Sequence, residues 1–400
     1  MSNLPEGWER KRIDELCRVT RGASPRPIHE WVAPAGTPWI KIADATADPS
    51  KYITKTKEFI RNEGRTKSVV VYPGDLILSN SATPGIPKFL GIEACIHDGW
   101  LLLRELRDID PMYLYYVFLN DRKDLAGQGN GSIFTNLKTD IVKSHKLMVP
   151  PIWEQQAIAE VLGALDDKIA ANTKLSETAI SLLEAHFAAL GLNRDPAEDA
   201  AVVGLDELVT LNPKYAAPSE TEPIYVDMQK LPVSNLSISD WDHRPAKGGA
   251  RFMNGDTLLA RITPCLENRK TGFVDFLKES QIGIGSTEFI VLRSRPGVPV
   301  ALSYFLATSE RFRTFAIRHM VGTSGRQRVS ALDLTGYTLG RPVESALTSF
   351  GEASKSTFPF VKSLTDENRT LATTRDALLP QLMSGKLRVK DAEALVAAAV

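Results

Sequence analysis

Two glycine-rich segments carry side chains whose types could contact a nucleic acid. The first segment, residues 129–138, contains Ser132, Thr135, Asn136 and Lys138, and the second, residues 322–328, contains Ser324, Arg326, Gln327 and Arg328. Arginine can pair bidentately with guanine and Asn or Gln with adenine, whereas Lys, Ser, Thr and glycine N–H groups suit phosphates. We therefore predict two DNA-contacting loops, with structural turns as the alternative.

A second pair of segments follows two similar Gly-Asp strands. Asn80 and Ser81 come shortly after Gly74-Asp75, and Arg261 and Thr263 come shortly after Gly255-Asp256. Arg269 and Lys270 lie a few residues further along the second segment. These positions complete the predicted set of DNA-binding residues.

The charge of the chain is balanced overall but not locally. It has 48 basic and 48 acidic residues, which alone would argue against a polyanionic partner. Residues 51–67, 243–270 and 310–341 each hold six basic and two acidic residues. Clusters of this size could contact phosphates, although solvated charged faces would give the same pattern.

Motifs for catalysis or cofactor binding are incomplete. Gly127, Gly129 and Gly131 resemble a nucleotide loop but follow a helical pattern instead of a strand. Residues 212–215, Asn-Pro-Lys-Tyr, resemble the Asn-Pro-Pro-aromatic tetrapeptide of adenine methyltransferases without its second proline, and we interpret them as a turn. GxxxxGK[ST], GxSxG and HExxH patterns do not occur, and the 3 cysteines form no CxxC pair. We predict no cofactor, no metal and no catalytic residues.

The chain is internally duplicated. Ile13-Asp14-Glu15-Leu16 returns as Leu205-Asp206-Glu207-Leu208 after 192 residues, and the Gly-Asp strand at Gly74 returns at Gly255 after 181. Leu137-Lys138-Thr139-Asp140 is echoed 193 residues later, and Asn172-Thr173-Lys174-Leu175 is echoed 196 residues later. Collinear matches at nearly constant spacing indicate two copies of one unit, each a globular segment followed by a helix.

The two helical segments show a heptad pattern. Between Ile152 and Leu190, apolar residues recur seven apart, interrupted by the polar residues Asn172, Ser176 and His186, which could fix the register of a helix pair. The second stripe, from Thr357 to Leu382, is poorer, and Pro359 and Pro380 should each kink or interrupt its helix. The short β-rich runs in the globular segments, such as residues 68–72 and 288–292, are bounded by Gly and Pro and favour a mixed α and β fold.

These patterns predict an α+β protein with two duplicated globular domains, each followed by a long helix with a coiled-coil pattern. The predicted segments are domain 1 at 1–151, a central helix at 152–196, domain 2 at 197–342, a distal helix at 343–390 and a tail at 391–400. An intact helix of about 38 residues would extend about 57 Å, more than one turn of DNA.

Several of these segments resemble the specificity subunits of type I restriction-modification systems. The similar residues are Leu4-Pro5-Glu6-Gly7-Trp8, the stretch from Gln155 through Asp166 to Asn172, and the stretch from Asp376 through Gly385 to Leu387. The resemblance spans nearly the whole chain, but residues 351–360 lack the Gln-Gln-x-Ile run that a distal copy would have. It implies two duplicated mixed α/β target-recognition domains separated by a long antiparallel helix pair, a coiled coil, which spaces the domains and docks modification subunits.

The resulting hypothesis is a non-catalytic subunit that reads an asymmetric bipartite target in double-stranded DNA. Its expected partners are the methyltransferase subunits of a type I complex, two of them, with restriction subunits as possible further partners. The alternatives are a self-sufficient DNA methyltransferase or nuclease, and a coiled-coil scaffold that binds only proteins. The absence of a signal-like N-terminus and of an 18-residue apolar run predicts a cytoplasmic protein without a membrane anchor.

Overall fold

The computed structural model describes residues 5–47, 50–127, 136–233, 235–245, 248–323 and 325–399. The chain divides into two compact units, unit 1 with residues Met1–Ala170 and Thr370–Val400, and unit 2 with residues Ala171–Arg369. Two long helices, α5 (Ile152–Ala189) and α10 (Glu344–Met383), each contribute one part to each unit.

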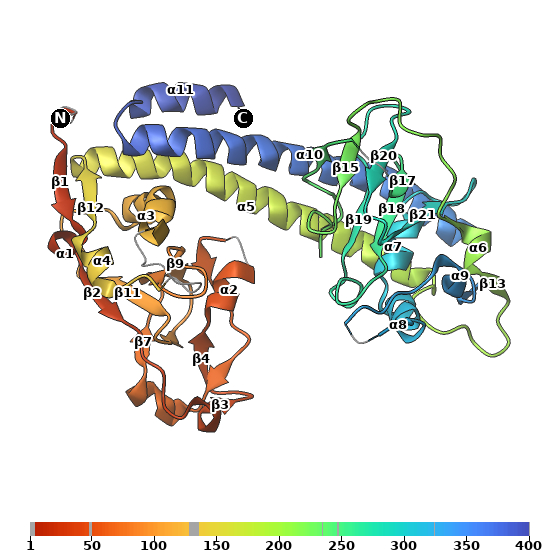
Figure 1. The fold of residues 1–400 in the computed structure, drawn as a ribbon, viewed down its shortest axis with the longest axis horizontal. Coiled ribbons are helices and arrows are strands. Elements are labelled where there is room, and N and C mark those ends of the chain that lie inside the picture. Colours follow the sequence, from red (N-terminus) through yellow and green to blue (C-terminus); the bar gives the residue numbers. More distant parts are fainter. Residues whose placement is uncertain are drawn as a thin grey trace. The chain divides into compact units, whose positions relative to one another are not determined.

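Unit 1 contains two five-stranded sheets (Figure 1). The first has the order β2 (Arg18–Arg21), β11 (Trp100–Arg104), β8 (Leu76–Ser79), β9 (Pro87–Leu90), β5 (Tyr52–Ile53). The second has the order β3 (Val32–Ala33), β6 (Phe59–Ile60), β4 (Thr37–Ile40), β10 (Ala94–Ile96), β7 (Val69–Val71). A separate antiparallel pair joins β1 (Glu9–Arg12) to β12 (Lys146–Val149). The helices of this unit besides α5 and α10 are α1 (Ile13–Leu16), α2 (Ile42–Ala47), α3 (Pro111–Gly127), α4 (Thr139–Ser144) and α11 (Val389–Ala399).

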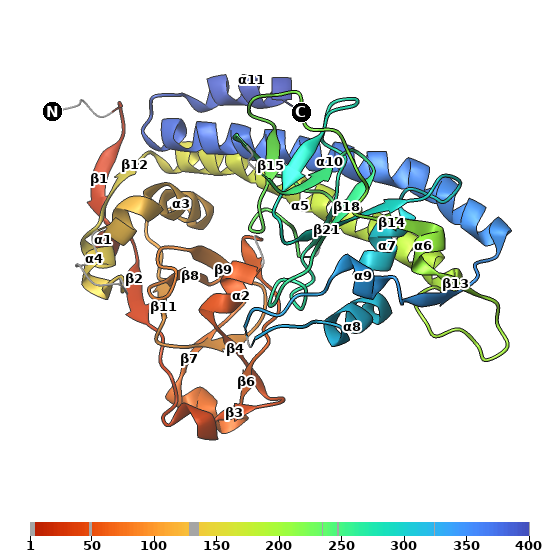
Figure 2. The ribbon, with the colours of Figure 1, turned by 45° about the vertical axis from the view of Figure 1, so that its right-hand side comes forward.

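Unit 2 repeats this plan with shorter sheets (Figure 2). Its first sheet has the order β14 (Val209–Leu211), β21 (Phe289–Ser294), β18 (Asp256–Ala260), β19 (Thr271–Phe273). Its second has the order β16 (Asp242–His243), β15 (Ile224–Val226), β20 (Gly283–Gly285), β17 (Ala250–Phe252). The pair β13 (Val202–Gly204) and β22 (Thr338–Gly340) corresponds to β1 and β12. The short helices are α6 (Leu205–Leu208), α7 (Leu302–Thr308), α8 (Glu310–Arg318) and α9 (Ala331–Leu334).

The Gly-Asp motif begins the central strand of each first sheet for the same physical reason. Gly74 and Gly255 have φ values of 91° and 90°, a left-handed conformation that favours glycine. The following aspartate accepts a hydrogen bond from the backbone three residues earlier and pairs with an arginine of the neighbouring strand, Arg104 for Asp75 and Arg293 for Asp256. The duplication seen in the sequence is therefore a duplication of structure, and the predicted fold class is confirmed.

The residues that carried the family resemblance meet in unit 1. Gln155 is buried; its amide donates to the carbonyls of Asp108 and Pro150, and its carbonyl accepts the N–H of Asp110. The indole of Trp8 donates to Glu154 at 3.0 Å, and Arg388 pairs with the same carboxylate at 2.8 Å.

The two long helices run antiparallel within each unit. In unit 1, Asp166 of α5 pairs with Arg375 of α10, and Glu154 of α5 pairs with Arg388, just beyond the end of α10. In unit 2, Asn172 of α5 is buried and donates to Glu367 of α10 at 2.8 Å. Its predicted place in the heptad pattern requires this position between the two helices.

The expected interruptions of the distal helix do not occur, because α10 continues through both Pro359 and Pro380. Beside Pro359, the ring of Phe358 packs 4.8 Å from that of Phe273 and also contacts Tyr304 and Phe305. A proline costs an exposed helix about 3 kcal/mol, and burial of one large aromatic side chain offsets most of that cost.

Candidate nucleic-acid interface

In each unit the backbone joins the two segments that the sequence singled out. In unit 1, Asn80 receives a hydrogen bond from the N–H of Leu137 at 2.8 Å and donates its own N–H to Gly99 at 2.8 Å. In unit 2, Arg261 receives one from Val329 at 3.0 Å and donates to Glu288 at 3.0 Å. Asn80 and Arg261 therefore occupy the same backbone position in the two copies, directly after the central strand.

The predicted residues differ in how far the structure describes them. Ser132, Thr135 and Ser324 lie outside the described residues. In unit 1, Asn80 is buried, Ser81 is half-buried, and Asn136 and Lys138 are exposed. Lys138 is the residue before the first turn of α4, and Ser330 holds the same place before α9.

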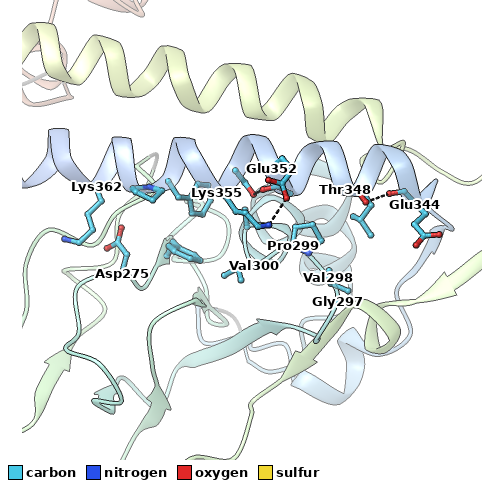
Figure 3. Close-up of a pocket in the computed structure, with 17 residues that line it drawn as sticks. Asp275, Gly297, Val298, Pro299, Val300, Glu344, Thr348, Glu352, Lys355 and Lys362 are labelled. Atoms are coloured by element: carbon cyan, nitrogen blue, oxygen red, sulfur yellow. Dashed lines mark hydrogen bonds and ion pairs between the residues drawn. The ribbon is translucent and has the colours of Figure 1, made fainter.

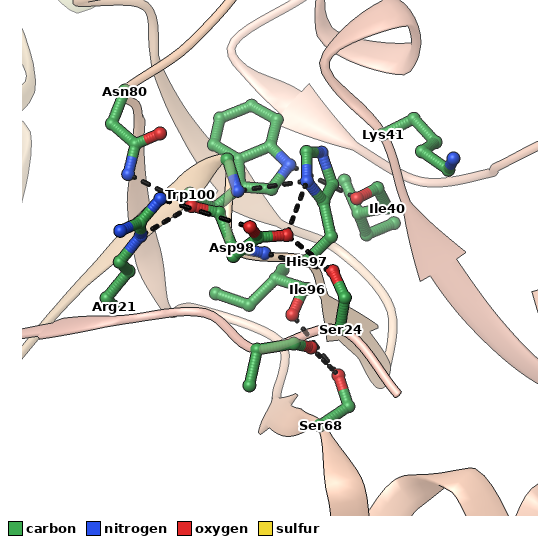
Figure 4. A network of polar contacts seen from close by, with 12 residues as sticks. Arg21, Ser24, Ile40, Lys41, Ser68, Asn80, Ile96, His97, Asp98 and Trp100 are labelled. Carbon is green, nitrogen blue, oxygen red and sulfur yellow. Dashed lines mark hydrogen bonds and ion pairs between the residues drawn. The ribbon is translucent and has the colours of Figure 1, made fainter. Parts of the chain in front are cut away.

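The polar residues around Asn80 form a network centred on Asp98 (Figure 4). The Asp98 carboxylate accepts the hydroxyl of Ser24 at 2.5 Å and lies 3.6 Å from the guanidinium of Arg26. Its backbone carbonyl accepts the side chains of Arg21 at 2.8 Å and Asn80 at 3.2 Å. The hydrogen bond from Ser24 holds the pKa of Asp98 below its usual range, so the carboxylate is ionised at neutral pH.

His97 is the buried neighbour of this network. Its Nδ1 accepts the N–H of Gly99 at 2.9 Å, and its ring contacts Trp39 edge to face at 5.9 Å. Burial lowers the pKa of His97, so the ring is neutral at pH 7. A side chain at Gly99 would lie 2.2 Å from the His97 ring and 2.6 Å from Ser81, and the turn therefore requires glycine.

The corresponding place in unit 2 holds a carboxylate bound by two arginines. Arg328 donates through Nε and Nη2 to Glu288 at 2.7 to 2.9 Å, and Nε of Arg261 lies 3.4 Å from Glu288 Oε2. The hydrogen bonds from Arg328 lower the pKa of Glu288. Thr263 holds Gln327 of the glycine-rich segment 322–328: its N–H donates to the Gln327 carbonyl at 3.0 Å, and its hydroxyl accepts the Gln327 N–H at 3.1 Å.

Two predicted residues of unit 2 have other partners. Arg269 pairs with Glu310 at 2.9 Å on the surface, and Lys270 donates to the carbonyl of Met228 at 2.7 Å. Arg326 is exposed and has no side-chain partner among the described residues.

The basic clusters are partly neutralised by local ion pairs. In residues 51–67, Lys51 pairs with Asp167 and Arg65 with Glu93, whereas Lys55, Lys57 and Arg61 are exposed without an acidic partner in the described parts of the chain. In residues 310–341, ion pairs hold Arg311, Arg313, Arg328 and Arg341. Each cluster therefore offers fewer free cations than its composition indicates.

The first and last residues of the Asn-Pro-Lys-Tyr tetrapeptide form hydrogen bonds that hold unit 2 together. Asn212 exchanges backbone and side-chain hydrogen bonds with Val291, and the hydroxyl of Tyr215 donates to buried Asp256 at 3.0 Å. It borders a hollow of about 600 Å³, lined by Asn212, Pro213, Lys214, Tyr215, Gly249, Ala250, Arg251, Arg261, Thr287, Phe289 and Val291. The basic side chains on this wall lie next to the Glu288 cluster.

A second cavity of unit 2, about 630 Å³, lies along the beginning of α10 (Figure 3). Its wall is mostly apolar, with Phe273, Pro299, Leu347 and Phe358, and Asp275 lies at one end near Lys362. Burial raises the pKa of Asp275 to about 6.

Sequence reasoning missed Glu288, Asp98 and His97. All three precede the strand next to the Gly-Asp strand, β21 in unit 2 and β11 in unit 1. Alignment of these two turns in the duplicated sequence would have been the signal. Within the described ranges no three His, Cys, Asp or Glu side chains are grouped to hold a metal ion, and every helix there is too short or too polar to span a bilayer.

Comparison with known proteins agrees with this architecture. Residues 5–179 match the family described as the type I restriction modification DNA specificity domain. The chain is 23% identical to the MjaIX specificity subunit of Methanocaldococcus jannaschii, across 98% of this chain and 96% of that one. It is 21% identical to the MjaVIII specificity subunit of the same organism, across 97% and 95%. The fold is similar to the crystal structure of a type I system S subunit from M. genitalium, with a TM-score of 0.57, 15% identity, and coverage of 96% and 97%.

A duplicated α+β unit, each copy followed by one long helix, defines the class of the protein. Residues 5–179 match the DNA specificity domain of type I restriction-modification systems, and nearly the whole chain is similar to specificity subunits of type I restriction enzymes.

Proposed function

We propose that this chain reads an asymmetric bipartite sequence in double-stranded DNA, one part with each unit. The observation that carries the proposal is the shared backbone position of Asn80 and Arg261, whose carbonyls accept the N–H groups of Leu137 and Val329. Two copies of one surface with different side chains suit two different half-sites, because Asn and Arg favour different bases. The exposed side chains of Lys138 and Arg326 would contact phosphates or base edges next to the bases that Asn80 and Arg261 read.

The chain would not methylate or cut DNA itself, because partner subunits would carry those activities. It would dock two methyltransferase subunits, one for each copy of the duplicated helix, with restriction subunits as further members of the assembly. Type I specificity subunits named in the comparisons are parts of restriction enzymes, which supports this division.

Sequencing the methylated sites of cells that express this chain with its neighbouring methyltransferase tests the proposal. The expected result is one motif with two defined parts and an unspecified spacer. Titration calorimetry of the isolated chain with S-adenosylmethionine should give no binding heat. A measurable affinity would favour a self-sufficient methyltransferase instead.

The proposal also makes α5 a spacer, since its 38 residues would extend about 57 Å. Inserting four residues after Asn172 adds about 6 Å, and one base pair advances about 3.4 Å. The unspecified DNA spacer should therefore lengthen by about one or two base pairs, with both defined parts unchanged. An unchanged spacer in a fully active variant would contradict the spacer role.

A further inference from the structure

Arg261 stands out because only its terminal guanidinium edge is free. Its backbone is fixed by hydrogen bonds from Val329 and to Glu288, each at 3.0 Å. Its Nε is buried beside the Glu288 carboxylate, at 3.4 Å, whereas neither terminal nitrogen makes a hydrogen bond to a described residue. The backbone hydrogen bonds and the ion pair of Nε with Glu288, which is not a hydrogen bond, limit the positions that the planar group can take.

Both carboxylate oxygens of Glu288 already have cationic partners within the fold. Three hydrogen bonds from Arg328 and the ion pair with Arg261 occupy both carboxylate oxygens. Arg328 in turn directs its remaining Nη1 toward the carbonyl of Arg326 at 3.3 Å. The side chain of Arg328 is 39% exposed but bonds Glu288 and Arg326, whereas the terminal nitrogens of Arg261 have no hydrogen-bond partner among the described residues.

The side chain of Arg261 also borders an accessible space. It is 31% exposed and forms part of the wall of the 600 Å³ hollow, together with Lys214 and Arg251. The corresponding residue of unit 1, Asn80, is only 4% exposed. A duplex edge can thus reach the unit 2 side chain more readily than its counterpart.

We infer that Arg261 determines specificity for a guanine in the half-site of unit 2, and that Glu288 and Arg328 are positioning residues that hold its guanidinium in plane. This inference rests on the proposed function. The two free terminal nitrogens match the O6 and N7 acceptors of guanine in the major groove, and a pre-oriented fork loses less side-chain entropy on binding.

The experiment compares variants of the full chain, in complex with its methyltransferase subunits, in selection from a library of randomised DNA duplexes. Arg261→Lys keeps the positive charge but loses the fork, and Arg261→Asn introduces the unit 1 residue. Both should reduce preference for guanine at one position by about 5- to 150-fold, with the other half-site unchanged. Glu288→Gln should weaken the same preference at the same position, without lowering the unfolding temperature as far as loss of a buried residue would.

Arg341→Ala is the matched control, since Arg341 forms an exposed pair with Glu207 in the same unit. It should leave the selected sequence unchanged. If Arg261→Lys selects the same sequence as the wild type, or if Arg261→Asn weakens all duplexes equally, Arg261 contacts the backbone and the inference is overturned. A wild-type complex that selects no sequence at all would refute the proposed function itself, which is a different outcome.

Discussion

The two units build the same site with different chemistry. In unit 1, the hydroxyl of Ser24 and the guanidinium groups of Arg21 and Arg26 lie around the Asp98 carboxylate, and the residue after the central strand, Asn80, is buried. In unit 2, two arginines bind the Glu288 carboxylate, and Arg261 reaches the surface. The backbone of the site therefore depends on the Gly-Asp strand and the glycine-rich segment, whereas the side chains at the strand ends are free to differ between copies.

The largest expected difference between the units concerns the Gly-Asp motif itself. Asp256 is fully buried, and Asp256→Ala would leave Arg293 and Tyr215 without their shared partner. We expect a loss of about 3–5 kcal/mol in the local stability of unit 2. The side chain of Asp75 is 15% exposed, so Asp75→Ala should lower the stability of unit 1 by only about 1–2 kcal/mol.

Hydrogen exchange of the β18 and β8 amides measures these two costs separately, which a single unfolding curve of a two-unit protein would not. Arg341→Ala and Arg18→Ala are the controls, because each breaks an exposed ion pair and should cost less than about 1 kcal/mol. If Asp75→Ala and Asp256→Ala lowered local stability equally, the deeper burial of Asp256 would have no effect on stability.

The pH dependence of stability should have opposite signs in the two units. The folded-state pKa of Asp275 is raised to about 6 from 3.8, so between these values the folded unit 2 holds a proton that the unfolded chain has lost. Stability therefore falls as pH rises from about 4 to 6, by up to about 3 kcal/mol, and is constant above. Asp275→Asn should remove this slope, and the variant should gain stability relative to the wild type as pH rises.

Asp98 of unit 1 provides the opposite case. Its pKa is lowered, chiefly by the hydrogen bond from Ser24, so its contribution is present above the unfolded pKa and is lost as pH falls through the folded one. Thermal unfolding of Asp275→Asn and Asp98→Asn between pH 3 and 8 compares the two. The same sign of slope for both would show that Asp275 is not protonated by burial.

Much of the fold follows from local sequence signals, and the candidate site follows only in part. The duplicated motifs predict both copies because each has a local cause, such as the positive φ of Gly74 and Gly255. The continuity of α10 through Pro359 was not predictable, since it depends on the packing of Phe358 against residues far away in sequence. The pairing of Arg328 with Glu288 likewise joins residues 40 apart, and composition alone presents that arginine as free.

Arg326 gives a test of the glycine-rich segment in unit 2. It is exposed, and no acidic side chain in the described parts of the chain neutralises it. Arg326→Ala should reduce discrimination at one base pair of the unit 2 half-site by about 1–3 kcal/mol, measured by competition between duplexes that differ at one position. Preserved discrimination at every position would make this segment a structural turn.

Lys138 of unit 1 should show the smallest effect, because an exposed lysine before the first turn of α4 suits a phosphate more than a base. Loss of one phosphate contact changes the slope of log affinity against log salt concentration by about 0.9 and lowers affinity for all duplexes alike. Lys138→Ala should therefore bind target and unrelated DNA more weakly by the same factor, with a shallower salt dependence and the same selected sequence. Lys174→Ala, on the exposed face of α5, is the matched control for loss of one positive charge. If Lys138→Ala changed the base preference of the unit 1 half-site, Lys138 would read sequence as Arg326 is expected to do, and the two glycine-rich segments would be equivalent in role as well as in position.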